Sequence, residues 1–175
     1  YNVDDDGGNS AVEVIRMVKV LDTTVPVITL KGEAEVTIEA GSTFTDSGVT
    51  ITDNVDKELT VITAGTIDTG RLGLSVLAYN VTDKSGNKAA EITRKVTVVD
   101  TTAPVITLKG EAVLIHEGAT AYTDEGATVT DNLDTDLAIA VTGTIDVLKL
   151  SEQTLTFDAT DSSGNKATSL TRKVT

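Results

Sequence analysis

The sequence predicts an all-β protein built from tandem copies of one small domain. Val and Thr are abundant, and apolar and polar residues alternate over short stretches, as they do in strands that bury one face. No stretch shows the 3.6-residue apolar period of an amphipathic helix. A gapless internal repeat sets the length of one copy at 78 residues, from Asp22 to Val99.

The repeat divides the chain. Asp22–Ala34 returns almost letter for letter as Asp100–Ala112, and Tyr1–Val3 matches Tyr79–Val81 at the same offset of 78. We therefore expect the sequence to be a slice of a longer array. The expected parts are the C-terminal strands of a preceding repeat (1–21), a whole domain (22–99) and a nearly whole one (100–175).

Short strands separated by Gly, Asp and Asn turns fill each copy. The expected strands of the first whole copy are Val27–Leu30, Glu35–Glu39, Val49–Thr52, Leu59–Thr63, Thr66–Asp68, Leu74–Thr82 and Ala89–Val99. Seven short strands in a domain of this size are typical of an immunoglobulin-like fold. The predicted fold class is therefore tandem seven-stranded immunoglobulin-like β-sandwiches in an elongated array.

Two of these strands indicate which face is buried. Leu77, Tyr79 and Val81 share one face of the sixth strand, so this face points inward. The inward row of the last strand is apolar except at Arg94. Because a charge on a half-buried row needs an acceptor, we expect Arg94 to pair with a neighbouring aspartate, Asp46.

Composition and charge exclude several classes of function. The net charge of −13 disfavours nucleic acid and anionic membranes as partners, and no apolar run approaches the roughly 18 residues that a membrane span needs. We expect no membrane insertion within this segment. Cysteine is absent, and the single histidine, His116, corresponds to Ile38 in the other copy. A catalytic triad has no base in such a pattern, so we expect no enzyme.

Three motifs resemble a known family. Asp100–Gly110, the acidic box Thr130–Asp134 and the run Ala159–Ala167 are similar to bacterial Ig-like repeats of the type first named from an insecticidal crystal protein, relatives of the hyalin-repeat modules. The resemblance implies a secreted or cell-surface bacterial protein. Such repeats occur in surface adhesins, in filament proteins and as spacers in secreted polysaccharide-degrading enzymes.

Acidic loops at the ends of the strands predict a Ca²⁺ site. If the strands run up and down in sequence, the loop that holds Asp53 and Asp56 lies at the far end of its domain, next to the linker at Asp100 and the turn at Asp161. Ca²⁺ prefers carboxylate and carbonyl oxygens held by loops. We therefore expect these four aspartates to be ligands at the junction, although Asp and Asn also form turns without any ion.

These observations favour a non-catalytic spacer or stalk of a cell-surface adhesin or extracellular filament, with adjacent repeats as its partners and Ca²⁺ stiffening its junctions. One alternative is a polymerising filament subunit, in which residues 1–21 complement an identical subunit by strand addition. Another is a glycan-binding accessory module of a secreted enzyme. Phe44 and Tyr122 are the aromatic residues left to stack on a sugar in that alternative.

Overall fold

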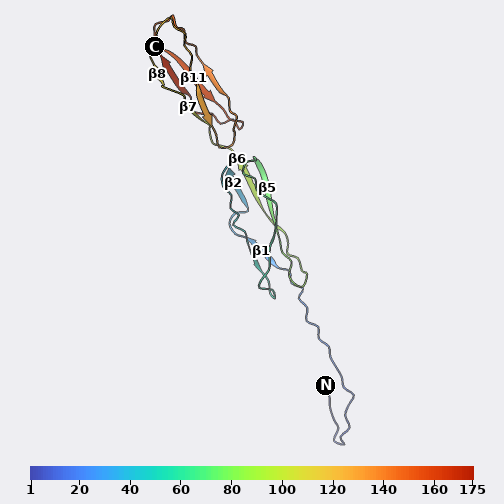
Figure 1. The fold of residues 1–175 in the computed structure, drawn as a ribbon. Coiled ribbons are helices and arrows are strands. Elements are labelled where there is room, and N and C mark those ends of the chain that lie inside the picture. The colour runs from blue at the N-terminus through green and yellow to red at the C-terminus, as the bar shows by residue number, and fades with distance from the viewer.

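The structure, a computed structural model, describes residues 1–175 and contains strands but no helix. Two domains of the same topology are stacked end to end, with residues near the N-terminus lying beyond the first domain (Figure 1). The first domain contains β1 (Val27–Leu30), β2 (Glu35–Glu39), β3 (Val49–Thr52), β4 (Ile62–Ala64), β5 (Gly73–Asn80) and β6 (Ile92–Val99). The second contains β7 (Val105–Leu108), β8 (Val113–Leu114), β9 (Ala127–Thr130), β10 (Ile139–Thr142), β11 (Gln153–Ala159) and β12 (Leu170–Val174).

Each domain has a two-stranded and a four-stranded sheet. Strand β1 pairs with β3, and the larger sheet has the order β2-β6-β5-β4; the second domain repeats this arrangement with β7-β9 and β10-β11-β12-β8. The predicted all-β tandem of Ig-like sandwiches is therefore confirmed, with six strands assigned in each copy.

The fifth of the seven expected strands, Thr66–Asp68, pairs with no neighbour. The chain leaves the sheet at Gly65, which has a φ of +97° and whose missing Cβ would lie 2.2 Å from the Val76 carbonyl oxygen. Only glycine permits this approach. Ile67 nevertheless packs against the core, so the segment still covers the sandwich.

Strands β1 and β2 run in the same direction and act as one strand that changes sheets. Strand β1 begins beside the β5–β6 turn, where Asn87 Nδ2 donates to the Asp22 carbonyl oxygen at 3.3 Å. Strand β2 is parallel to β6 and ends with it, Glu39 opposite Val99. We call the end of a domain where its first strand begins the N-terminal pole, and the opposite end the C-terminal pole.

The predicted inward faces are confirmed. Leu77, Tyr79 and Val81 are buried against Ile28 of the facing sheet. Leu155, Phe157 and Ala159 form the equivalent core with Ile106. Burial of each large side chain contributes about 1.5–3 kcal/mol, so these small cores hold most of the apolar stabilisation that each domain has.

Arg94 satisfies the backbone where the first strand changes sheets. The side chain is 2% exposed and forms an ion pair with Asp46, as predicted. Its Nε donates to the Glu33 carbonyl oxygen at 2.9 Å and its Nη2 to that of Lys31. Because the crossover between β1 and β2 leaves these carbonyls without ladder partners, the guanidinium replaces the missing strand.

The second domain repeats the buried arginine. Arg172 is 1% exposed, lies 2.6 Å from Asp124 Oδ2 and donates to the carbonyl oxygens of Glu111 and Lys109. Burial by itself would raise the pKa of Asp124, but the ion pair and hydrogen bonds with Arg172 and Tyr122 hold it below its usual value. The arginine is thus a structural part of the repeat.

Residues 1–21 form a hairpin turn without a domain around it. Asp5 Oδ1 accepts hydrogen bonds from the backbone N–H groups of Gly7 and Asn9. Asp4 and Ser10 form an isolated antiparallel β-bridge. Tyr1 is 85% exposed, whereas Tyr79 at the same place in the repeat is 1% exposed. The match to Tyr79 predicts that Tyr1 points inward, but no facing sheet covers Tyr1, and its side chain stays exposed.

Candidate functional site: the acidic poles and the joint between the domains

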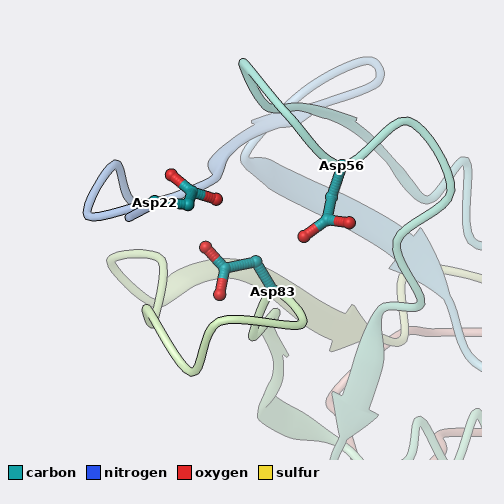
Figure 2. A group of neighbouring side chains, drawn as sticks. All are labelled: Asp22, Asp56 and Asp83. Carbon is teal, nitrogen blue, oxygen red and sulfur yellow. The ribbon is translucent and has the colours of Figure 1, made fainter. Parts of the chain in front are cut away.

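Three aspartates from separate segments meet at the N-terminal pole of the first domain. Asp22 comes from the chain before β1, Asp56 from the loop after β3 and Asp83 from the turn after β5. One carboxylate oxygen from each lies within 4.8 Å of the other two. Figure 2 shows the three carboxylates facing one space.

The second domain has an equivalent acidic cluster at its own N-terminal pole. Asp100, Asp131 and Asp134 each offer one oxygen, again all within 4.8 Å of one another. Asp161 lies beside them, since the Asn165 amide donates both to Asp161 Oδ2 at 2.8 Å and to the Asp100 carbonyl oxygen at 3.2 Å.

Backbone N–H groups orient these carboxylates. Asp53 Oδ1 accepts the N–H of Val55 at 2.9 Å and that of Asp56 at 2.8 Å, and these hydrogen bonds lower the pKa of Asp53. Burial raises the pKa of Asp161, yet hydrogen bonds from the side chain and backbone of Asn165 outweigh this effect and lower it. Both groups are therefore ionised at neutral pH.

Several carboxylate oxygens in the two clusters and in the Asp53 loop are buried without a hydrogen-bond partner. They are Asp22 Oδ2, Asp53 Oδ2, Asp100 Oδ2 and Asp131 Oδ1. These four residues are two pairs of equivalents in the repeat, so the same feature occurs in both domains. An ionised oxygen without a partner is costly to bury, and a cation would remove that cost.

The structure divides the four predicted ligands between two places. Asp56 groups with Asp22 and Asp83, and Asp53 belongs to the same loop, whereas Asp100 and Asp161 lie at the second domain. The expected meeting of all four at one junction is wrong. The prediction assumed that successive strands alternate in direction. Strands β1 and β2 run in the same direction instead, so the loop after β3 returns to the N-terminal pole.

The surroundings of the two clusters differ in charge. Lys57 Nζ donates to the carbonyl oxygens of Asp53 and Asn54 at 2.9 and 3.1 Å in the first domain, and Thr135 replaces this lysine in the second. Lys84 Nζ lies 3.4 Å from Asp56 Oδ1 in the first domain. Its equivalent in the second domain is Ser162, whose N–H and hydroxyl donate to Asp134 at 2.8–3.0 Å. The first cluster therefore carries its own cation, and the second is left with uncompensated negative charge.

Glu39 links the two domains, and the sequence reasoning missed it. Its carboxylate accepts the backbone N–H and the hydroxyl of both Thr101 and Thr102, at 2.8–3.0 Å. These hydrogen bonds, the Thr101 N–H first, lower the pKa of Glu39 to about 2. The available signal was the repetition of this glutamate as Glu117 in the second copy.

A second contact crosses the joint beside the acidic cluster. Asn132, between Asp131 and Asp134, donates from Nδ2 to the Ala40 carbonyl oxygen at 3.0 Å. A Cβ added to Gly41 would lie 2.9 Å from the Asn132 carbonyl oxygen, so the two backbones are in close contact. The C-terminal pole of the first domain thus rests on the loop that holds the second acidic cluster.

The aromatic residues and the histidine belong to other environments. Phe44 and Tyr122 pack against the two cores, which leaves the proposed sugar-stacking residues turned inward. His116 contacts Thr120 and the edge of the Tyr122 ring. No helix of the structure has the length and apolar character to cross a membrane.

Comparisons with known proteins point to one family. A family model described as "Bacterial surface protein, Ig-like domain" matches residues 28–98 and 106–175, two matches that start 78 residues apart. No curated protein matches the chain.

Several solved structures show weak similarity. The lipoprotein BT2262 from Bacteroides thetaiotaomicron is 17% identical, with a TM-score of 0.37; the match covers 78% of this chain and 61% of that one. Human protocadherin-24 EC1-2 is 12% identical, with a TM-score of 0.40 and coverage of 87% and 99%. The CbhA fibronectin(III)-like modules of Clostridium thermocellum are 16% identical, with a TM-score of 0.32 and coverage of 84% and 92%. These scores are too low to support an argument.

Proposed function

Because this chain belongs to the family of bacterial surface protein Ig-like domains, we propose that it is a non-catalytic spacer that gives length and stiffness to a protein of the bacterial surface. The observation that carries the proposal is the joint, by which we mean the linker after Asp100 together with the contacts between the two domains on either side of it. Glu39 of one domain holds both linker threonines by backbone and side-chain hydrogen bonds, and Asn132 of the next domain returns a bond to Ala40. A linker anchored from both sides resists bending.

The linker sequence supports the same function. Pro104 is buried at the start of β7 and restricts both its own φ and the conformation of Ala103. Only the residues between Asp100 and Pro104 separate the domains, and Glu39 accepts hydrogen bonds from two of them, Thr101 and Thr102. Such a short, restrained connection favours an elongated shape over a folded-back pair of domains.

The test is the distribution of distances between the domains. The chain has no cysteine, so Thr93→Cys and Thr171→Cys introduce the only two labelling sites, on exposed and equivalent positions of β6 and β12. Double electron–electron resonance between spin labels at these two cysteines should give one narrow distribution of distances between the domains. Glu39→Ala should broaden it, while the matched change Glu35→Ala, on the same strand, should not. A broad distribution in the parent chain would refute a stiff spacer.

In this proposal, residues 1–21 are the last two strands of a preceding repeat. Their turn repeats the hydrogen bonds of the later copies: Asp5 accepts from Asn9 as Asp83 accepts from Asn87 and Asp161 from Asn165. Val3 and Val20 are 68% and 91% exposed, while their equivalents Val81 and Val98 are each 2% exposed. The apolar face lacks the sheet that covers it in a complete domain.

Strand complementation between identical chains is the second candidate, and the same exposed hairpin favours it. Light scattering across a concentration series separates the two. A spacer stays monomeric when residues 1–21 are removed and when they are present. Association that depends on concentration and disappears with this deletion would favour the filament subunit instead.

A further inference from the structure

We propose that the second acidic cluster, Asp100 with Asp131 and Asp134, binds one divalent cation of the calcium type, and that this cation controls the stiffness of the joint. The inference names a regulator for the proposed spacer, but the binding site itself stands on separate observations. It also assigns a ligand set that contains no residue of the first domain.

The first observation is a buried carboxylate without a partner. Asp100 is 9% exposed, and its Oδ2 is buried without a hydrogen-bond donor. One oxygen of this carboxylate lies within 4.8 Å of an oxygen of Asp131 and of Asp134. Asp131 Oδ1 is also buried and unpaired. Negative groups gathered in this way repel one another and lose hydration, so the arrangement is unfavourable until a positive charge joins it.

The second observation is that backbone N–H groups fix the orientation of these carboxylates by donating to the other oxygen of each. Asp131 Oδ2 accepts the N–H groups of Leu133 and Asp134 at 2.9 and 3.0 Å, which leaves Oδ1 for a ligand. Asp100 Oδ1 accepts the Thr102 N–H at 3.3 Å, which leaves Oδ2. Bonds of this kind orient carboxylates around a metal before it arrives.

The donor set selects the class of cation. Every available ligand is an oxygen, and neither cysteine nor histidine is near, so the cluster suits a hard cation rather than zinc or copper. Ca²⁺ accepts six to eight oxygens in flexible geometry and completes its shell with water, whereas Mg²⁺ requires a near-ideal octahedron at shorter distances. Loops that supply only three carboxylates fit the first ion better.

The first cluster acts as an internal comparison. Lys84 already places an ammonium group 3.4 Å from Asp56, and a divalent cation must compete with it. Ser162 at the equivalent position brings no charge to Asp134. The second pole should therefore bind more tightly than the first, although each aspartate at one pole has an equivalent aspartate at the other.

The position of the second cluster couples it to the joint. Asp100 starts the linker that Glu39 holds, and the Asp131–Asp134 loop carries Asn132, which contacts Ala40. A cation shared by Asp100 and this loop would lock the linker and the contact surface together. By linkage, the ordered joint must in turn raise the affinity for the cation.

Calorimetry on the full chain, after treatment with chelator, tests the site. Titration with CaCl₂ should show one site per chain in the sub-millimolar to millimolar range expected of extracellular modules. Asp131→Asn keeps the acceptor for the Leu133 N–H and removes the free charge, so the affinity should fall at least tenfold. Asp53→Asn, the equivalent change in the first domain, should leave that affinity unchanged.

Two further variants keep the test decisive if Asp131→Asn unfolds. Ser162→Lys should abolish the site by supplying the ammonium group that Lys84 brings to the first cluster. The double change Lys57→Thr with Lys84→Ser, which removes both ammonium groups from the first pole, should add a second site. No heat of binding in the parent chain, or equal losses from Asp53→Asn and Asp131→Asn, would overturn the inference. MgCl₂ binding as tightly as CaCl₂ would overturn the assignment to calcium.

The distance measurement described above separates this inference from the spacer function. Chelator should broaden the distribution between labels at positions 93 and 171, and added CaCl₂ should narrow it. A narrow distribution that ignores Ca²⁺ would overturn the control by the cation and leave the spacer intact. A broad distribution in both conditions would refute the spacer, while the binding isotherm would still decide the site.

Discussion

Tyr79 and Tyr122 occupy different positions of the repeat, yet each donates its hydroxyl to the aspartate that pairs with the buried arginine of its own domain. Tyr79 donates to Asp46 and Tyr122 to Asp124, both at 2.8 Å. The residue equivalent to Tyr79 is Phe157, and the one equivalent to Tyr122 is Phe44. Each core thus contains one phenylalanine and one tyrosine, exchanged between the copies with the hydrogen bond retained.

The exchange predicts a rescue. Tyr79→Phe removes a hydrogen bond to a charged acceptor and should lower the free energy of unfolding of the first domain by about 1.5–3 kcal/mol. Adding Phe44→Tyr should recover most of this loss, because the new hydroxyl reaches Asp46 from the position that Tyr122 uses. Urea unfolding followed by circular dichroism measures both. Phe44→Tyr failing to restore stability would show that the two positions are not interchangeable.

Removal of Arg94 should be far more damaging than removal of its equivalent in the N-terminal hairpin. Arg94→Met leaves the carbonyls of Lys31 and Glu33 without a donor and Asp46 without its ion pair, which should cost about 3–5 kcal/mol. Arg16 is exposed, so Arg16→Met should leave the urea midpoint within error. Equal effects would mean that the buried network does not stabilise the domain.

The joint should loosen in acid. The pKa of Glu39 falls from 4.5 to about 2 when the linker is clamped, so its contribution is complete above pH 4.5 and disappears as the pH falls through about 2. The distance distribution between the domains should therefore broaden across this window. In Glu39→Gln the part of the broadening that comes from Glu39 should be absent, so the distribution should change less with pH than in the parent chain when both are measured with chelator and circular dichroism shows no unfolding.

Gly41 and Gly48 allow backbone strain to be separated from contact across the joint. Both have positive φ, +72° and +70°, but only at Gly41 would a Cβ meet the other domain, 2.9 Å from Asn132 O. Alanine at either position should cost about 1 kcal/mol of domain stability. Gly41→Ala alone should also alter the distance between the domains. A similar change in Gly48→Ala would attribute the effect to the backbone instead.

Much of the fold can be predicted from local pattern. Alternation along β5 and β6 places Leu77, Tyr79 and Val96 inward because successive side chains of a strand point to opposite faces. The same alternation identifies Arg94 as the one charged residue on the inward row, and its predicted partner, the turn aspartate Asp46, forms the ion pair. The 78-residue offset then carries each conclusion to the second domain.

The direction of β2 cannot be predicted in this way. Alternation within Glu35–Glu39 is the same whether the strand pairs with a neighbour in the parallel or the antiparallel sense, so the pattern does not say whether the chain reverses at Lys31–Ala34. Only the pairing of β2 with β6 decides it. That single choice moves the loop after β3 from one pole to the other and changes which aspartates meet.

Repeat length, strand content and the buried arginines therefore follow from residue types and spacing, because they depend on contacts that recur within every copy. By contrast, the aspartates that lie near Asp100 and the hydrogen bonds of Glu39 to the linker can be seen only in the folded chain. They depend on segments far apart in sequence that approach only after the first strand has changed sheets and the second domain has docked on the first.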